Sequence, residues 1–123
     1  MSLFAILKIV FVLAVALLHI YILVLEMFLW TKPKGMKTFR MTLEQAQSTA
    51  VLAANQGLYN GFLAAGLIWS LFLTDFEVSR AVSIFFLGCV LVAGIYGGYS
   101  VGKRIFFVQG IPAILALIVT VLA

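Results

Sequence analysis

The chain has 123 residues, of which 65% are hydrophobic and 10% are charged, and its mean hydropathy is +1.23. This composition lies outside the range of soluble globular proteins and is typical of a polytopic membrane protein. Spanning segments of about 20 residues each would use most of the chain, so we expect one transmembrane domain over residues 1–123. The net charge of +4 lies in short loops beside apolar segments. It therefore predicts contact with the lipid bilayer and its anionic headgroups, and no nucleic-acid partner.

The first predicted helix covers residues 3–30, and the proline and glycine of Lys32-Pro33-Lys34-Gly35 prevent its continuation. Its apolar run is too long for the core of a cleaved signal peptide, so we expect an uncleaved helix. Lys8 interrupts this run, and its long side chain can snorkel outward. A basic loop then extends to Thr42.

A second helix is predicted over residues 42–73. Thr42-Leu43-Glu44-Gln45 has the pattern of a capping box, in which the threonine hydroxyl and the glutamine side chain satisfy each other's backbone amides. At 1.5 Å per residue this helix is roughly 45 Å long, which exceeds the thickness of the hydrocarbon core. Its first turns are therefore expected at or beyond the headgroups.

Two further helices are predicted over residues 78–102 and 105–122. Asp75 or Ser79 can cap the first of them, and Gly110 and Pro112 predict a bend in the second. The fold class that follows is all-α, an integral membrane up-down bundle of four transmembrane helices.

Lysine and arginine are distributed unevenly over the loops of this bundle. Four lie between the first and second helices, one lies between the second and third, and two lie between the third and fourth. The positive-inside rule therefore predicts cytoplasmic first and third loops, with both termini outside. The expected location is a cell membrane, the bacterial plasma membrane.

Two stripes of small residues predict where helices approach closely. The pattern places the second helix against the third, or at a subunit interface. Because four short helices seldom enclose a pocket alone, we also expect a homo-oligomer, a trimer or a dimer. The stripes consist of Thr49, Ala53, Gly57, Gly61 and Ala65, and of Gly94, Gly98 and Gly102.

The polar side chains of the four helices gather in the half that is predicted to face the cytoplasm. Polar groups in hydrocarbon are costly unless they are paired or hydrated, so we expect them to converge on a pocket for a small amphiphilic or lipophilic ligand. Glu26 and His19 share one helix face, about 20° apart, and either could act as an acid–base group in an enzyme. The candidate ligand-binding residues are His19, Glu26, Asn55, Gln56, Tyr59, Asn60, Tyr96, Tyr99, Arg104 and Gln109.

Other interpretations of the same residues remain open. The amides and tyrosines can be plain interhelical hydrogen-bond partners, which would leave a non-catalytic scaffold or partner subunit. One histidine, one nearby carboxylate and the lone Cys89 do not form a metal site, and no cofactor is expected.

Four segments together resemble one family of small integral membrane proteins of bacteria and fungi, which carries the domain of unknown function thirteen-oh-four. The resemblance covers nearly the whole chain and implies a membrane protein without implying an activity. The segments are His19 to Trp30, Ala54 to Gly61, Gly94 to Gly97 and Val108 to Ala113.

The order of the helices is also similar to that of the membrane-associated eicosanoid and glutathione metabolism family, whose trimers bind glutathione and a lipophilic substrate. This resemblance would place Asn55 and Asn60 near that family's second-helix motif and Tyr96 and Tyr99 near its third-helix tyrosines. The chain departs from the pattern at Val92, where that family has an arginine. Four helices with one carboxylate in the first also resemble the small multidrug exporters, which implies a small proton-coupled exporter as a further alternative.

Overall fold

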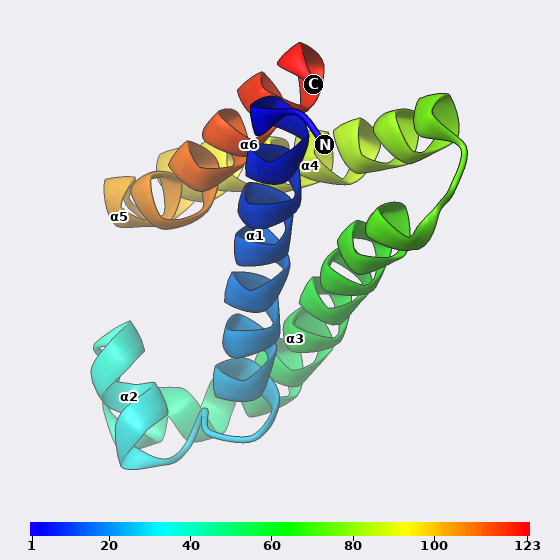
Figure 1. Ribbon diagram of the computed structural model, residues 1–123. Coiled ribbons are helices and arrows are strands. Elements are labelled where there is room, and N and C mark those ends of the chain that lie inside the picture. Colours follow the sequence, from blue (N-terminus) through cyan, green and yellow to red (C-terminus); the bar gives the residue numbers. More distant parts are fainter. The chain divides into compact units, whose positions relative to one another are not determined.

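The computed structural model describes all 123 residues and is all-α (Figure 1). The last three elements follow one another without a break, so they form one continuous helix from Lys103 to Leu122. The elements are α1 (Leu3–Met27), α2 (Pro33–Phe39), α3 (Leu43–Phe72), α4 (Phe76–Ser100), α5 (Lys103–Ile105), the π-helical segment η1 (Phe106–Gly110) and α6 (Ile111–Leu122).

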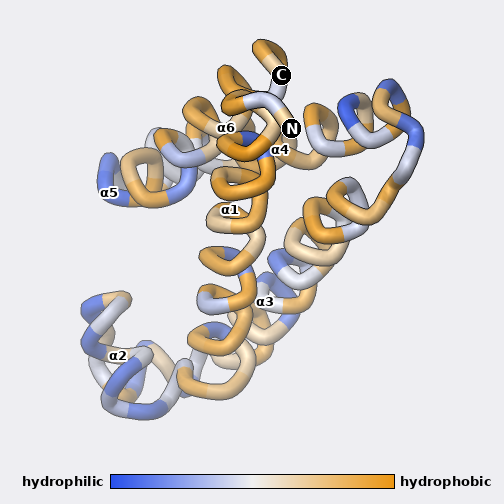
Figure 2. The backbone as a smooth tube through the Cα atoms, viewed as in Figure 1, coloured by the Kyte–Doolittle hydropathy of each residue, from blue (hydrophilic) through white to orange (hydrophobic).

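Three helices are long and apolar enough to cross a membrane: Leu3–Met27, Phe76–Ser100 and Lys103–Leu122. Figure 2 shows hydrophobic residues along most of their length. In each of these helices, only a minor share of the apolar 18-residue stretch is buried within the protein, namely 28%, 28% and 22% in chain order. Apolar side chains on outward faces are what lipid requires, so the chain is a multi-pass membrane protein. The fourth predicted span, α3, is not among the helices that are long and apolar enough to cross a membrane.

The chain forms two compact units. Unit 1 comprises residues 1–16 and 63–123, and unit 2 comprises residues 17–62. Each unit therefore contains a part of α1 and a part of α3. The other helices belong to one unit only, with α2 in unit 2 and α4, α5 and α6 in unit 1.

Unit 1 contains an apolar core built from every long helix. Its buried members are of moderate or small size, and alanines on the last helix allow the helices to approach closely. Burial of such side chains is the main source of stability for a packed core. The buried cluster consists of Val12, Val15, Ala16, Leu67, Leu87, Val90, Ala113 and Ala116.

The turn before α4 is fixed by hydrogen bonds. Asp75 is the N-cap residue, and its Oδ1 accepts a bond from the Val78 backbone N–H at 3.0 Å, which confirms one of the two predicted caps. The Ser79 hydroxyl donates to the Ser70 carbonyl at 2.6 Å, and Arg80 donates to the Val121 carbonyl at 3.1 Å. These bonds tie the ends of α3, α4 and α6 together within unit 1.

Lys8 is buried in unit 1. Its residue is 8% exposed, and its Nζ lies 5.5 Å from the centroid of the Phe76 ring. A cation over an aromatic face gains electrostatic attraction. The amine that the sequence allows to snorkel outward is thus covered by the start of α4.

The π-helical segment η1 lies where the sequence predicts a bend. Pro112 has no backbone N–H and cannot donate to the carbonyl of Val108, so a regular α-helical ladder is interrupted there. The Ile111 N–H bonds the Phe106 carbonyl instead, one residue further back than in an α-helix. Gly110 within this segment is buried against Gly94 of α4.

Unit 2 differs from the prediction between the first two long helices. The helix predicted over residues 3–30 ends at Met27, and the residues predicted as a loop include the short helix α2. Proline at the start of a helix is favourable, because its fixed φ suits the first turn and its missing N–H has no partner there anyway. The first helix does end before Pro33, as predicted, but the sequence analysis did not foresee that Pro33 also begins a helix.

The capping box that begins α3 is confirmed. The Gln45 side chain accepts a bond from the Thr42 N–H at 2.9 Å, and the Thr42 hydroxyl accepts one from the Gln45 N–H at 3.1 Å. The reciprocal pair satisfies two backbone donors that the first turn leaves free.

The small-residue stripe of α3 has a different partner from the predicted one. A Cβ on Gly57 would lie 2.6 Å from Met27 Cγ, and a Cβ on Gly61 would lie 2.7 Å from Leu23 Cδ1. Both glycines thus pack against α1, whereas the sequence predicts the third long helix or another subunit. The contact of α3 with α4 in unit 1 involves Gly66, which faces the Phe86 ring.

The crossing of α4 and η1 predicts opposite effects for two glycines of the same helix. A Cβ on Gly94 would lie 2.8 Å from the Gly110 backbone N, which cannot move cheaply, whereas a Cβ on Gly88 meets no atom within 4 Å. Gly94→Ala is expected to lower the free energy of unfolding by about 1–3 kcal/mol. Gly88→Ala should raise it by about 0.5–1 kcal/mol, because alanine favours helix. Unfolding curves in mild detergent measure both, and equal effects would contradict the close approach.

Candidate functional site

A hydrogen bond between α1 and α3 joins two of the candidate residues in unit 2. Asn60 Nδ2 donates to Glu26 Oε1 at 2.6 Å. Glu26 is 5% exposed although it lies at the end of an apolar helix. Glu26 and Asn60 are therefore the central pair of the candidate site.

The glycines of α3 bring this pair together. An added Cβ on Gly57 would lie 3.1 Å from Glu26 Cβ and 3.3 Å from the Leu23 carbonyl oxygen, so the backbone of α3 runs directly against α1 at this point. Small residues permit such close approach. Asn60, three residues further along α3, then lies within reach of the carboxylate.

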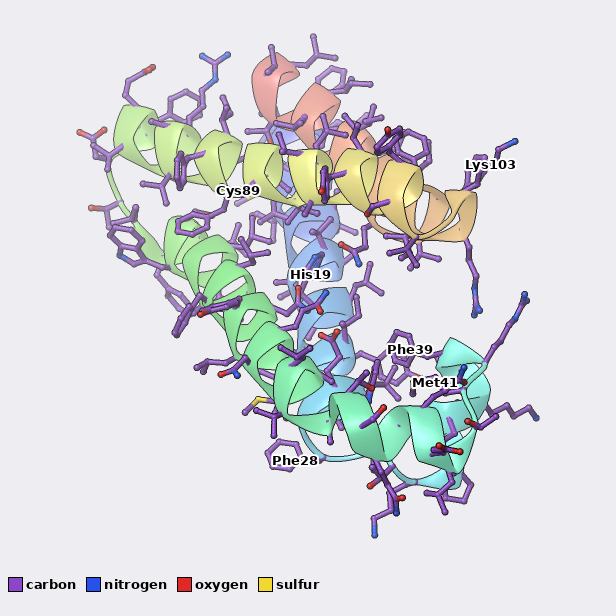
Figure 3. The ribbon with its side chains drawn as sticks, turned by 180° about the vertical axis from the view of Figure 1, so that it is seen from behind. His19, Phe28, Phe39, Met41, Cys89 and Lys103 are labelled. Atoms are coloured by element: carbon purple, nitrogen blue, oxygen red, sulfur yellow. The ribbon has the colours of Figure 1, made fainter.

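His19 lies on the same helix as Glu26, two turns closer to the N-terminus. It is fully buried, and Figure 3 shows its position on α1. Seven residues at 100° each place the two side chains about 20° apart around α1, and about 10 Å apart along its axis. His19 thus extends the buried polar face of α1 that begins at Glu26.

The other candidates on α3 lie outside the buried contact. Gln56 is exposed and lies one turn before Asn60, about 40° away around the helix, so it borders the pair. Asn55 and Tyr59 are exposed on the side that faces away from α1. The Asn55 amide donates to the Val51 carbonyl of its own helix at 3.1 Å.

The remaining candidates belong to unit 1. Tyr96 and Tyr99 are exposed on α4, where they and two aliphatic neighbours, Val92 and Ile95, line an open depression of about 450 Å³. Arg104 is exposed in α5, and Gln109 is half-buried in η1. No hydrogen bond joins Tyr96 or Tyr99 to Gln109, and the lining of the depression is apolar except for the tyrosine hydroxyls.

No group of three histidine, cysteine, aspartate or glutamate side chains is placed to hold a metal ion. Cys89 is a free, partly buried thiol on α4.

One structural contact beside the candidate site escaped the sequence analysis. Trp30 Nε1 donates to the Thr49 hydroxyl at 3.0 Å, and its ring lies 4.8 Å from that of Phe39, centroid to centroid. The contact joins the end of α1 to α2 and α3. A tryptophan directly after an apolar run is a signal that could have found it, because tryptophan prefers the membrane interface.

Comparison with known proteins gives a family for this architecture. The profile of the family described as "Protein of unknown function (DUF1304)" matches residues 13–121. The chain belongs to this family. It is also similar to "Uncharacterized protein YpaA" of Lactococcus lactis subsp. lactis (strain IL1403), with 37% identity over 117 residues that cover 92% of this chain and 95% of that protein. No solved structure matches the chain significantly.

The matched residues include all ten candidate residues, from His19 to Gln109. The first of the resemblances drawn from the sequence is thus confirmed. Neither match carries a stated activity, so the function must be inferred from the chemistry of the site.

The Glu26–Asn60 bond predicts an asymmetry in stability. Asn60→Leu leaves a buried carboxylate without its donor and is expected to lower the free energy of unfolding by about 1–3 kcal/mol. The double change Glu26→Leu with Asn60→Leu should restore most of that loss, because it removes both polar partners. Unfolding curves in mild detergent provide the measurement.

Gln47→Leu, at an exposed position of α3, is the matched control and should change the free energy of unfolding by less than about 0.5 kcal/mol. A double variant as unstable as Asn60→Leu alone would show that the fold itself requires the pair.

Proposed function

We propose that the protein is a four-span membrane protein that binds a small amphiphilic ligand, with the Glu26–Asn60 pair holding the ligand's polar group. The observation that carries this proposal is a nearly buried carboxylate at the end of an apolar helix, bonded by a single amide. An ionisable residue within a span is costly and is retained mainly where it has a task.

The position of α3 beside α1 supports a fourth span. In unit 2, Gly57 and Gly61 lie against α1. In unit 1, Leu67 of α3 shares the apolar core with Val12 and Val15 of α1. Because α1 is long and apolar enough to cross a membrane, a helix that lies along both of its halves would cross with it.

The distribution of cations supports the orientation. With four spans, the segment from Lys32 to Arg40 and the turn at Lys103 and Arg104 emerge on the same side, and both are basic. Cytoplasmic loops carry such an excess of positive charge. The end of α1 that contains Glu26 would then lie on the cytoplasmic side of the bacterial plasma membrane.

The chemistry of the pair indicates the class of ligand. A carboxylate has about four positions that accept hydrogen bonds, and the Asn60 amide fills one of them. An amine or hydroxyl of an amphiphile would satisfy others while its apolar part stays in lipid. The exposed Gln56 beside Asn60 offers a further carboxamide at the edge of the site.

A specific observation also favours a role as a partner subunit. The side of α3 that faces away from α1 exposes residues at alternating spacings of four and three, namely Ser48, Leu52, Asn55, Tyr59 and Phe62. Such spacing forms a continuous seam along a helix, and an asparagine within it can pair with its own copy. A second copy of the chain would fit this seam, in line with a homo-oligomer. A proton-coupled exporter is less favoured, because Glu26 lies at the end of its helix and not at mid-membrane.

The four-span topology predicts which residues are labelled together. With Cys89 replaced by serine, single cysteines at Lys37→Cys and Lys103→Cys should both react with a membrane-impermeant maleimide in inverted vesicles and stay unlabelled in intact cells. Both positions are exposed, so neither is shielded by the protein. If α3 does not cross, the two positions fall on opposite sides, and only one of them would be labelled in each preparation.

Native mass spectrometry of the purified protein tests ligand binding and reads the subunit number at the same time. The wild type should retain a defined non-lipid species, and Glu26→Gln or Asn60→Ala should lose it, by at least tenfold if a charge-assisted bond of about 1.5–3 kcal/mol holds it.

Glu44→Gln and Gln47→Ala are matched controls, because they change the same groups at exposed positions of α3. They should retain the species. Equal retention by all four variants would rule out the pair as the binding site, and a protein that carries no such species in any preparation would favour the partner-subunit role.

A further inference from the structure

A cluster of cations lies immediately after the first candidate span. The basic segment, residues 32–40, contains Lys32, Lys34, Lys37 and Arg40 and has no acidic residue. All four cations are exposed, and none forms a salt bridge or a side-chain hydrogen bond. Figure 2 shows this segment, which contains α2, as one of the most hydrophilic parts of the chain.

The other face of the short helix α2 packs against the residues that follow α1. A Cβ on Gly35 would clash with the backbone of Leu29, and Phe39 packs on the Trp30 ring at 4.8 Å between centroids. Gly35 and Phe39 are four residues apart and so share the inner face of α2. Lys34 and Lys37, three residues apart, share the opposite face, about 60° from each other.

Arg40 ends α2 in an unusual conformation. Its φ of 55° and ψ of 51° lie in the left-handed region, and it is the one non-glycine residue of the chain with a positive φ. Glycine is the common residue at such helix ends, because a Cβ is unfavourable there. An observed backbone outlier of this kind supports a functional hypothesis for its side chain. Arginine at this position adds a third exposed cation to Lys34 and Lys37, at the expense of local strain.

The Trp30 and Phe39 rings indicate where this cluster lies. Both belong to the connection that follows α1, and tryptophan is enriched at the depth of the lipid headgroups. Three cations held at that depth, with no carboxylate to neutralise them, match the phosphate of a lipid. Arginine can bind phosphate through two parallel bonds, and lysine adds a compact charge.

We propose that the outer face of the basic segment, formed by Lys34, Lys37 and Arg40, is a binding site for the phosphate group of an anionic phospholipid. The site does not depend on the Glu26–Asn60 pair, because it uses different residues and a different chemistry. It assigns to α2 a role that topology alone would not require, since scattered loop cations would set the orientation equally well.

Lipid binding to the full-length protein in a neutral detergent tests the site. Phosphatidylglycerol and phosphatidylcholine are titrated in parallel, and retained lipid is counted by native mass spectrometry. The wild type should bind phosphatidylglycerol more tightly. Lys37→Gln should weaken this binding about fivefold, since one cation near an anionic lipid contributes about that factor.

Arg40→Gly separates binding from folding. Glycine relieves the left-handed backbone, so the midpoint of thermal unfolding should stay equal or rise while phosphatidylglycerol binding falls about fivefold. Lys103→Gln is the matched control, because it removes one exposed cation at the start of another helix. It should leave the binding unchanged.

The remaining outcomes would overturn the proposal. These are equal affinity for the two lipids, an equal loss of binding in Lys103→Gln, or unchanged binding in Arg40→Gly together with Lys37→Gln. Millimolar inorganic phosphate separates a lipid from a soluble source. It should displace no phosphatidylglycerol, and full displacement would assign the site to free phosphate.

Discussion

The close contact between the backbone of α3 and α1 at Gly57 and Gly61 is the constraint on which the arrangement of unit 2 depends. It allows Asn60 to reach Glu26, and it leaves the other side of α3 exposed. A larger residue at Gly57 would separate the helices and leave the carboxylate without its amide. In lipid, an unpaired polar group has no water to replace a lost partner. Packing and polar pairing are therefore coupled here, because the close approach of α3 to α1 brings Asn60 within reach of Glu26.

The same constraint sorts the polar residues of α3 into two groups. Asn60 faces α1, Gln56 borders the contact, and Asn55 and Tyr59 face away from it. At 100° per residue the four side chains are spread over about 140° of the helix circumference, so Asn60 and Asn55, at the two edges of this arc, face different surroundings. Those on the outer side must meet lipid headgroups, water or another protein chain.

The fold could be predicted from the sequence where a single local signal determined it. Apolar runs identified the three helices that meet the criterion for spanning, and the capping box at Thr42 and the cap at Asp75 formed as the residue pattern indicated. The helix α2 could not be recognised in this way, because Pro33 and Gly35 are helix breakers in most contexts. Here Pro33 occupies the first turn, and Gly35 lies where only a residue without a side chain fits against Leu29. That fit is a tertiary property, which local pattern does not contain.

For the site, the sequence identified the chemically unusual residues but not their pairing. Glu26 and His19 were placed on one face by spacing alone, yet the partner of Glu26 depended on which helix the glycine stripe would contact. The stripe was compatible with several neighbours, since small residues permit close approach to any helix. Only the contact with Leu23 and Met27 decides between them.

The two units differ in the kind of interaction that holds them. Unit 1 contains the whole apolar cluster and the Ser70–Ser79 and Arg80–Val121 bonds, which tie helix ends together. Unit 2 contains the carboxylate–amide pair, the basic segment and the strained Arg40. Strain and buried charge reduce stability and are retained where they serve a function. The two kinds of interaction thus involve different parts of the same helices, because α1 and α3 contribute residues to both units.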